Sequence, residues 1–279
     1  MLFHNYASWS LTSVLELAGM AQAEEWTYRY TSSDRPVPIL RNYVMYSFRR
    51  ASFQDRVVEV TDDDGSRYAT FNTGLLTPHY ERIFAFFVAQ TRSDYPQPWF
   101  LRDFCRESDY RLMRFQRLPE RATYFDHPAD LLYDPRLDLR VQYEHIVNDR
   151  VERFPEALRA DERRRTEAVR QAVQHAIFRV EQNYKTAIPQ YRFAPRDESD
   201  PGKLQLLLPL CLLDVSRADL ALSIDKVGDV YRSATVLTLD MAYNNARLIA
   251  RPDKEWLEPI PNLSGAESVP HDELAEVDQ

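Results

Sequence analysis

Asn72, Thr73 and Gly74 form the first of four polar segments in this chain that could bind a phosphate or a nucleobase. The pattern predicts that they end a strand just before a helix that begins near Thr77. A glycine there lets a ligand approach the backbone, and the free amides of a helix start attract anions. The alternative is an ordinary strand-to-helix turn, because neither a GxxxxGKS/T nor a GxGxxG motif occurs in the sequence.

A second polar segment, residues 240–247, follows directly after a predicted strand. Tyr243 could stack on a base there, while Asn244, Asn245 and Arg247 could read its edge or hold a phosphate. The alternative is a plain helix start with Asp240 as its cap. Adjacent asparagines are unfavourable inside a helix, so the ligand-binding interpretation stays open.

A third segment, residues 184–192, is predicted to be the loop after a long helix. Lys185, Tyr191 and Arg192 combine charge with a stacking surface, which suits a nucleotide. Exposed loops often carry such residues without any ligand, and that interpretation stays open as well.

The fourth segment, residues 130–149, carries charged residues at helical spacing, which predicts either plain i,i+4 salt bridges or a polar cleft. In a cleft, His145 would be the general acid or base of an enzyme and Arg140 would supply charge. The carboxylates that would then hold a divalent ion such as Mg²⁺ are Asp134, Asp138 and Asp240. Because zinc spacings, HExxH and GxSxG are all absent, the motifs predict no resident cofactor and leave enzymatic activity open.

The elements that position these segments begin with a helical segment over residues 1–34, in which Ser13 and Glu16 have the form of a capping box. Strands are predicted next, because the sequence takes on β character over residues 40–53, 56–60 and 67–76, with β-branched or aromatic residues in each run. The DDDG sequence at residues 62–65 predicts a hairpin turn between the second and third of these strands.

A helix is predicted after Gly74, because Thr77 can cap it, Pro78 fits its first turn and the following residues to Val88 are largely apolar. Residues 95–128 are predicted to be irregular, with a helix or a further strand. Residues 137–147 fit a strand at first and a helix later, so their structure stays ambiguous.

The strongest helical periodicity covers residues 155–185. The strands predicted after it occupy residues 204–213, 218–225 and 233–240. Gly228 lies in the turn between the last two strands, and residues 241–251 have helix character. This order indicates an α+β fold: a mostly antiparallel sheet with helices packed on it and one long helix in the middle of the chain.

The domain organisation predicted from these elements is a single α+β domain over residues 35–257, preceded by the helical segment 1–34. Residues 258–279 hold six acidic residues, three prolines and no lysine or arginine. That composition predicts a disordered acidic tail.

Composition narrows the classes of partner. The net charge of −8 argues against a protein that grips long duplex DNA, and no stretch is apolar enough for a membrane span. Only four of the 35 cationic residues are lysines; arginine suits a local phosphate pocket, although a GC-rich genome gives the same bias. A signal-peptide pattern is absent and Cys105 and Cys211 lie far apart, so a cytoplasmic location is expected.

Five strings carry a resemblance to a known family: FNTGLLT (71–77), PADLLYDPRLDLRVQYEHIVND (128–149), NYKTAIPQY (183–191), LQLLLPLCL (204–212) and TLDMAYNNARLI (238–249). Over roughly residues 35–258 the chain resembles a bacterial domain-of-unknown-function family whose members sometimes occur beside OST-HTH (LOTUS) RNA-binding domains. The resemblance implies work on RNA or nucleotides by association, and it assigns no catalytic residues. The sequence has no recognisable helix-turn-helix of its own.

The hypothesis that these patterns favour is a nucleotide- or short-RNA-binding module with a single phosphate and base pocket. One alternative is a nucleotide phosphohydrolase or transferase that uses a divalent metal. The other is a non-enzymatic protein-interaction scaffold. The sequence leaves the oligomeric state open.

Overall fold

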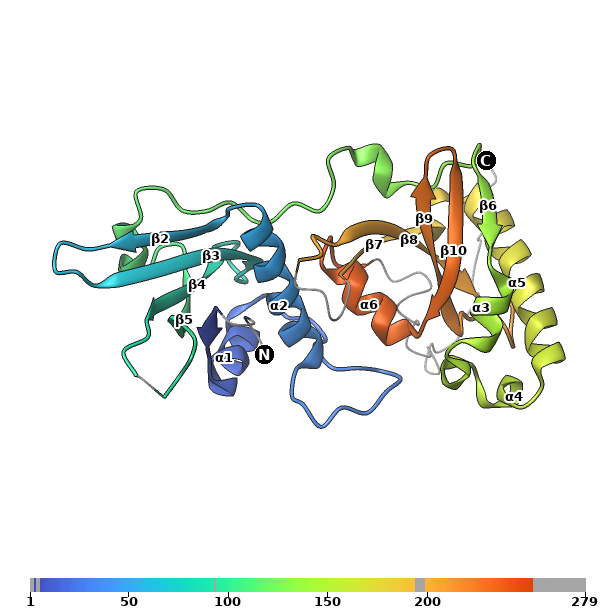
Figure 1. Ribbon diagram of the computed structural model, residues 1–279, viewed down its shortest axis with the longest axis horizontal. Helices are drawn as coiled ribbons and strands as arrows, with labels where there is room; N and C mark the ends of the chain where they lie inside the picture. Colours follow the sequence, from blue (N-terminus) through green and yellow to red (C-terminus); the bar gives the residue numbers. More distant parts are fainter. Residues whose placement is uncertain (1–2, 4–5, 93, 194–198, 253–279) are drawn as a thin grey trace, which may run out of the picture.

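Two five-stranded sheets, with helices between and beside them, make up the computed structural model, which describes residues 3, 6–92, 94–193 and 199–252 (Figure 1). The α+β class predicted from the sequence is confirmed. The predicted acidic tail, residues 258–279, lies outside the described residues.

The first sheet is antiparallel except for the short parallel pair at one edge, β1 with β5. Its strands, in spatial order, are β1 (Ala7–Ser8), β5 (Trp99–Arg106), β4 (Arg82–Ala89), β3 (Arg67–Leu76) and β2 (Val57–Thr61). The predicted β2–β3 hairpin is confirmed, because the Gly65 amide donates to the Asp62 carbonyl at 2.9 Å and Gly65 takes φ +82° in the turn.

The second sheet repeats this plan, with a single parallel pair, β6 with β10, at its edge. Its strands, in spatial order, are β6 (Asp138–Val141), β10 (Val230–Leu237), β9 (Leu220–Val227), β8 (Lys203–Leu210) and β7 (Ile188–Arg192). The three late strands predicted from apolar runs are confirmed, and Gly228, at φ +59°, forms the turn between β9 and β10.

The described helices are α1 (Leu11–Met20), α2 (Pro38–Phe53), α3 (Tyr143–Asn148), α4 (Glu156–Arg159), α5 (Glu162–Gln182) and α6 (Leu239–Arg247). Helix α1 begins one turn before the predicted capping box, because the Ser10 hydroxyl accepts from the Ser13 amide at 3.3 Å. Short 3₁₀ turns occupy Tyr110–Arg114, Pro128–Leu131, Val151–Arg153 and Tyr184–Thr186. Among the described residues, none of the helices has the length and hydrophobicity that crossing a bilayer requires.

The strand predicted for residues 40–53 is wrong, because this segment is helix α2. Its aromatic residues favoured a strand, but the side chains that α2 buries, Leu40, Tyr43, Val44 and Phe48 among them, recur at intervals of three and four residues. Spacing therefore outweighs β propensity here.

The helix predicted after Gly74 is also wrong, because residues 82–89 form strand β4. The Thr77 hydroxyl accepts from the backbone amides of His79 and Glu81, which closes a tight turn and not a helix. The strand lacks polar alternation because both of its faces are buried: Phe84 and Phe86 pack on one side, and their neighbours face the main core on the other.

The structure decides three further sequence predictions. Residues 137–147 contain both a strand, β6, and a helix, α3. The long helix predicted over residues 155–185 is α5, preceded by the separate turn α4, with the Asp161 side chain capping α5. Residues 184–192 are a 3₁₀ turn followed by strand β7, so the predicted loop is largely a strand.

One hydrophobic core joins the two sheets. It runs from Phe71 and Phe87 of the first sheet through α1, α2 and α6 to Leu207 and Ala221 of the second. Figure 1 shows α2 and α6 lying between the sheets, while α5 covers the far face of the second sheet. The arrangement brings α2, an early element, beside the second sheet, which forms much later in the chain.

Candidate functional site

A cavity of about 380 Å³ lies where α2, α6, the end of β10 and the segment after α3 come together. Its size falls within the range of small-molecule sites. The side chains that give it chemical character are Tyr46, His145, Asp149, Arg150, Arg153, Arg192, Phe193 and Asn245. We call it the cationic cavity.

Three arginines line the cationic cavity. The pKa of Arg153 is lowered, first by burial and then by the positive charges of Arg150 and Arg192. Arg153 is held in place, since it donates to the Val236 carbonyl at 2.5 Å. The side chains of Arg150 and Arg192 form no ion pair or hydrogen bond with another described residue. Unpaired cations next to a third arginine make a local site for an anion.

An aromatic pair contributes another part of the wall. The rings of Tyr46, from α2, and Phe193, just after β7, stack with 5.2 Å between centroids and 7° between planes. Burial raises the pKa of the Tyr46 phenol, so this side chain stays neutral. The Arg49 guanidinium lies 4.6 Å from the Phe193 centroid and supports the pair from outside the cavity.

His145 lies on α3 at the rim of the cationic cavity. Its Nδ1 is 3.4 Å from an Asp149 carboxylate oxygen, and both side chains are more than half exposed. The predicted i,i+4 pairing in this segment is therefore present, and it places a titratable group beside the arginines.

The paired asparagines of α6 face different neighbours. Asn245 lines the cationic cavity and donates to the Gln190 side-chain oxygen at 2.8 Å. Asn244 instead donates to the Asp240 carbonyl and accepts from Asn42 of α2. Of the two predicted readers, only Asn245 lines the cavity.

Asn72, Thr73 and Gly74 lie outside the cationic cavity, in the irregular end of β3. The Asn72 oxygen accepts from the Gly74 amide at 2.9 Å, and the Thr73 hydroxyl donates to the Ile83 carbonyl at 2.7 Å. Gly74 has φ +77°, and a Cβ there would lie 2.7 Å from the Tyr43 hydroxyl. The segment's side-chain groups are thus used within the fold.

Tyr243 and Arg247 are partners of Glu24. Arg247 forms a two-pronged ion pair with the Glu24 carboxylate at 2.5 and 2.8 Å, and Tyr243 donates to it at 3.3 Å. Burial is the largest influence on the pKa of Arg247 and would lower it, but the hydrogen bond to Glu24 and the electrostatic interactions with Tyr43, Glu24 and Tyr243 together raise it. These side chains join α6 to the segment before α2 and lie outside the cationic cavity.

Asp240 is a buried anchor and does not cap α6, because the cap is Thr238. The Asp240 carboxylate accepts from the backbone amides of Arg29, Tyr30 and Thr31 at 2.9 to 3.1 Å. It thereby fastens the N-terminal segment to α6.

The remaining predicted ligand residues, Tyr191, Arg140 and Lys185, also lie outside the cationic cavity. Tyr191 is buried and donates to the Pro201 carbonyl at 2.9 Å. Arg140 is exposed on edge strand β6, in register with Arg232. Lys185 lines a separate, largely apolar cavity of about 260 Å³.

The carboxylates considered as metal ligands have other neighbours. Asp134 is paired with Arg136 at 2.7 Å, which lowers the pKa of the Asp134 carboxyl to about 2. Asp138 begins edge strand β6, and Asp240 is buried against residues 29–31. No group of three histidine, cysteine or acidic side chains within the described ranges is arranged to hold a metal ion.

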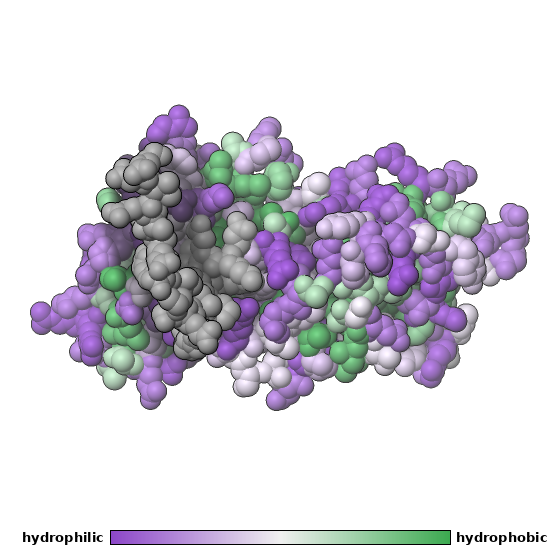
Figure 2. All heavy atoms as spheres, turned by 180° about the vertical axis from the view of Figure 1, so that it is seen from behind, coloured by the Kyte–Doolittle hydropathy of each residue, from purple (hydrophilic) through white to green (hydrophobic). Residues whose placement is uncertain are grey.

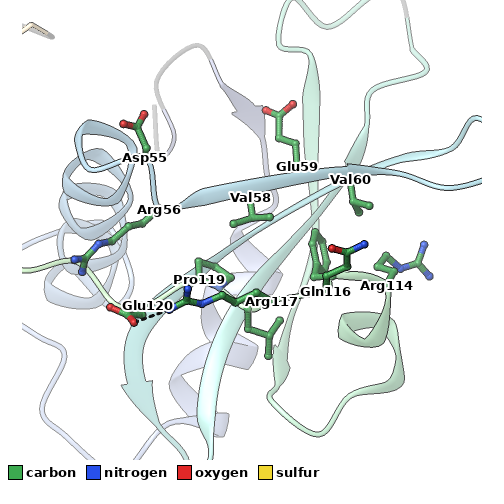
Figure 3. Close-up of a pocket in the computed structure, with 12 residues that line it drawn as sticks. Asp55, Arg56, Val58, Glu59, Val60, Arg114, Gln116, Arg117, Pro119 and Glu120 are labelled. Atoms are coloured by element: carbon green, nitrogen blue, oxygen red, sulfur yellow. Dashed lines mark hydrogen bonds and ion pairs between the residues drawn. The ribbon is translucent and has the colours of Figure 1, made fainter.

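A larger cavity, of about 560 Å³, lies beside edge strand β2, where Val58 and Val60 point to the side of the strand on which Pro119 and Gln116 lie (Figure 3). Its charges are compensated: Arg117 pairs with Glu120 at 3.2 Å, and Arg114 pairs with Asp62 at 2.8 Å. Hydrophilic side chains cover much of the face in Figure 2, with apolar groups in separate patches. The cationic cavity is therefore the stronger candidate for an anionic ligand.

Sequence reasoning placed His145, Arg192 and Asn245 in a site, and all three line the cationic cavity. It missed the side chains Tyr46, Phe193, Arg150 and Arg153. The spacing of Arg150 and Arg153 was an available signal, because like charges three residues apart are unfavourable within a helical turn unless they serve a purpose.

Comparison with known proteins places the chain in a family. Neither the curated proteins nor the solved structures gave a match. Residues 17–256 match the family described as "Domain of unknown function (DUF3825)"; this range includes part of α1 and strands β2 to β10. Because this match covers most of the 279 residues, the chain belongs to the DUF3825 family.

Proposed function

We propose that this protein binds a nucleotide, or the end of a short single-stranded RNA, in the cationic cavity. The observation that carries the proposal is the convergence of Arg150, Arg153 and Arg192 on one cavity, with two of them unpaired among the described residues. Guanidinium groups bind phosphate oxygens through paired hydrogen bonds, so a phosphate is the group that fits them.

The other cavity walls suit the remainder of a nucleotide. The stacked Tyr46 and Phe193 rings offer an aromatic surface, and Asn245 offers an amide at the base edge. The resemblance to a bacterial family whose members sometimes occur beside OST-HTH (LOTUS) domains supports the same class of ligand by association.

A small ligand fits this charge distribution better than a long polymer. The whole chain carries a net charge of −8, whereas the described residues that line the cavity include three arginines and one carboxylate, Asp149. A long nucleic-acid track would need many such contacts along the surface.

The test is the affinity of the full chain for a nucleoside monophosphate panel and short RNA oligonucleotides, measured by titration calorimetry. We expect Arg192→Ala and Arg150→Ala to weaken binding about tenfold or more, since each removes a charged hydrogen bond to phosphate. Arg140→Ala is the matched control, because Arg140 is exposed and outside the cavity. Equal affinities for the Arg192→Ala and Arg140→Ala proteins would refute the assigned pocket. A wild-type protein that binds none of these ligands would favour the scaffold alternative.

A second candidate, hydrolysis or transfer at a nucleotide phosphate, rests on His145 beside Asp149 at the cavity rim. His145 would serve as the general acid or base. A divalent ion would be held mainly by the substrate phosphates, because Asp149 is the only carboxylate among the described residues that line the cavity. Chromatography of nucleotides incubated with the protein and Mg²⁺ tests this candidate: His145→Gln should abolish product formation and preserve binding, and no product from the wild type would leave binding alone.

A further inference from the structure

A chain of side-chain hydrogen bonds crosses the second sheet and ends at Asn245 in the cationic cavity. Asn245 Nδ2 donates to Gln190 Oε1 at 2.8 Å, and Gln190 Nε2 donates to Gln205 Oε1 at 3.0 Å. Gln205 Nε2 then donates to Asp225 Oδ1 at 2.7 Å. We call these four residues the amide relay. Lys203 Nζ donates to the other Asp225 oxygen at 2.8 Å.

The direction of the amide relay is fixed at its far end. The ionised Asp225 side chain, paired with Lys203, can only accept hydrogen bonds, so Gln205 must present its nitrogen to it. The Gln205 oxygen therefore faces Gln190, and the same reasoning repeats along the chain. Gln190 and Gln205 are buried, at 0% and 3% exposure, so a reversed amide would leave like groups facing each other without water.

The hydroxyl of Ser223 fits the same direction. It accepts from Gln190 Nε2 at 2.8 Å and donates to Gln205 Oε1 at 3.0 Å. A hydroxyl can rotate to either role, so Ser223 supports the relay without setting its direction. Asp225 is thus the residue that determines how each amide is oriented.

In the relay, the Asn245 nitrogen donates to Gln190. The Asn245 Oδ1 has no hydrogen-bond partner among the described residues. We propose that this oriented oxygen selects nucleotides whose base presents an amino group, adenine or cytosine, over their keto counterparts, hypoxanthine and uracil. The inference rests on the proposed nucleotide binding. If the arginines hold the phosphate, the base amino group can donate to the Asn245 Oδ1. A keto oxygen at the same ring position would instead face that oxygen, and two acceptors cannot form a hydrogen bond.

Lys203 determines how the amides of the relay would be oriented if Asp225 were replaced by asparagine. In an Asp225→Asn protein, Lys203 still donates, so it takes the amide oxygen of the new side chain and leaves its nitrogen for Gln205. Every amide of the relay then turns over, and Gln190 donates to Asn245. Asn245 would present its nitrogen in place of its oxygen, and the preference would shift toward the keto base.

The experiment compares AMP with IMP, and CMP with UMP, by calorimetric titration of the full chain. We expect the wild type to bind the amino member of at least one pair about tenfold or more tightly. We expect Asp225→Asn to lower that ratio below one. Both ligands of a pair are measured on the same protein sample, so the ratio does not depend on the fraction folded.

Two variants serve as controls. Lys203→Met leaves Asp225 as an acceptor and should keep the wild-type ratio. Asp219→Asn makes the same chemical change at a carboxylate that accepts from the Leu212 and Leu213 amides and lies outside the relay, and it should also keep the ratio.

Several outcomes would overturn the inference. Equal affinities within each wild-type pair, a keto preference, or an amino preference that Asp225→Asn leaves unchanged would each do so and leave the proposed function intact. Binding of GMP alone would have the same consequence. Absence of binding to every nucleotide and oligonucleotide would refute the proposed function itself.

Discussion

Replacing Gly74 by alanine separates two physical costs that the structure places at one residue. Gly74 has φ +77°, a conformation that L-residues with a Cβ adopt at a cost. The added Cβ would also lie 2.7 Å from the Tyr43 hydroxyl oxygen, whereas the next nearest atoms are 4.0 Å away. The steric conflict therefore involves a single atom.

The expected magnitude follows from these two terms. The left-handed backbone costs alanine roughly 1–2 kcal/mol, and reduced freedom of the unfolded chain offsets about 0.4–1 kcal/mol of this. Forcing an atom into a packed site costs about 1–3 kcal/mol. We therefore expect Gly74→Ala to lower the free energy of unfolding by about 2–3 kcal/mol, measured by urea denaturation.

Two matched variants isolate the terms. Gly65→Ala has nearly the same φ, +82°, but no atom within 4 Å of the new Cβ, so it should cost only the backbone term of about 1 kcal/mol. Tyr43→Phe removes the conflicting oxygen, so the double variant with Gly74→Ala should recover about 1–2 kcal/mol relative to additivity.

Equal losses for Gly74→Ala and Gly65→Ala, or strict additivity with Tyr43→Phe, would refute this account of residue 74. Nucleotide affinity, corrected for the fraction folded, should be the same in the Gly74→Ala and wild-type proteins because Gly74 does not line the cationic cavity. A selective loss of affinity would return residues 72–74 to the list of ligand-binding candidates.

Three further predictions concern a buried ion pair, an exposed ion pair and a buried thiol. Glu24→Gln leaves Arg247 buried without its counter-ion and should lower the free energy of unfolding by about 3–5 kcal/mol in urea; a loss below about 1 kcal/mol would contradict the ion pair's role. The hydrogen bond from Arg136 lowers the pKa of Asp134 to about 2, so its stabilising contribution is complete above about pH 4 and is lost as the pH falls toward 2. NMR titration should show that this pKa rises in Arg136→Ala but stays below 3.8, because the backbone amide of residue 136 still donates to Asp134; an unchanged value would exclude the side-chain hydrogen bond as the cause. Burial raises the pKa of Cys105 to about 12, so iodoacetamide at pH 8 should label it only in urea; rapid labelling of the folded protein would contradict its burial.

The elements that the sequence predicted correctly are those whose signals are local. The hairpin at residues 62–65 and the turn at Gly228 carry residues that tolerate positive φ, and both turns form. Helix α5 shows a clear apolar stripe because only one of its faces is buried. Turn chemistry and one-sided burial are both properties of a short stretch of chain.

Two of the wrong predictions, those for α2 and β4, concern elements that are buried on more than one side. Helix α2 lies between the sheets, and strand β4 is central in the first sheet, with Phe86 facing one core and Phe87 the other. Burial on several faces removes the polar alternation from which periodicity is judged. In both, capping or propensity signals then pointed to the wrong element.

The sequence predicted only part of the site, and the part that it missed depends on the same misassigned helix. His145, Arg192 and Asn245 were chosen by residue type, and the fold brings them to one cavity. Tyr46 could not be grouped with them, because it lies on a helix that the sequence analysis assigned to a strand. Only the core shared by both sheets places α2 next to Phe193.

The TLDMAYNNARLI string, which forms helix α6, has several polar residues, but most of them bind other parts of the fold and do not line the cationic cavity. Asp240 binds the segment before α2, Asn244 binds α2, and Arg247 binds Glu24. These three polar residues connect parts of the chain that are about 200 residues apart, so their identity is set by assembly of the fold. Asn245 differs from them, because its oxygen has no such task within the described residues and its nitrogen is held by a relay that ends in Asp225. A polar residue that the fold orients but does not fully use is where a ligand contact is to be expected.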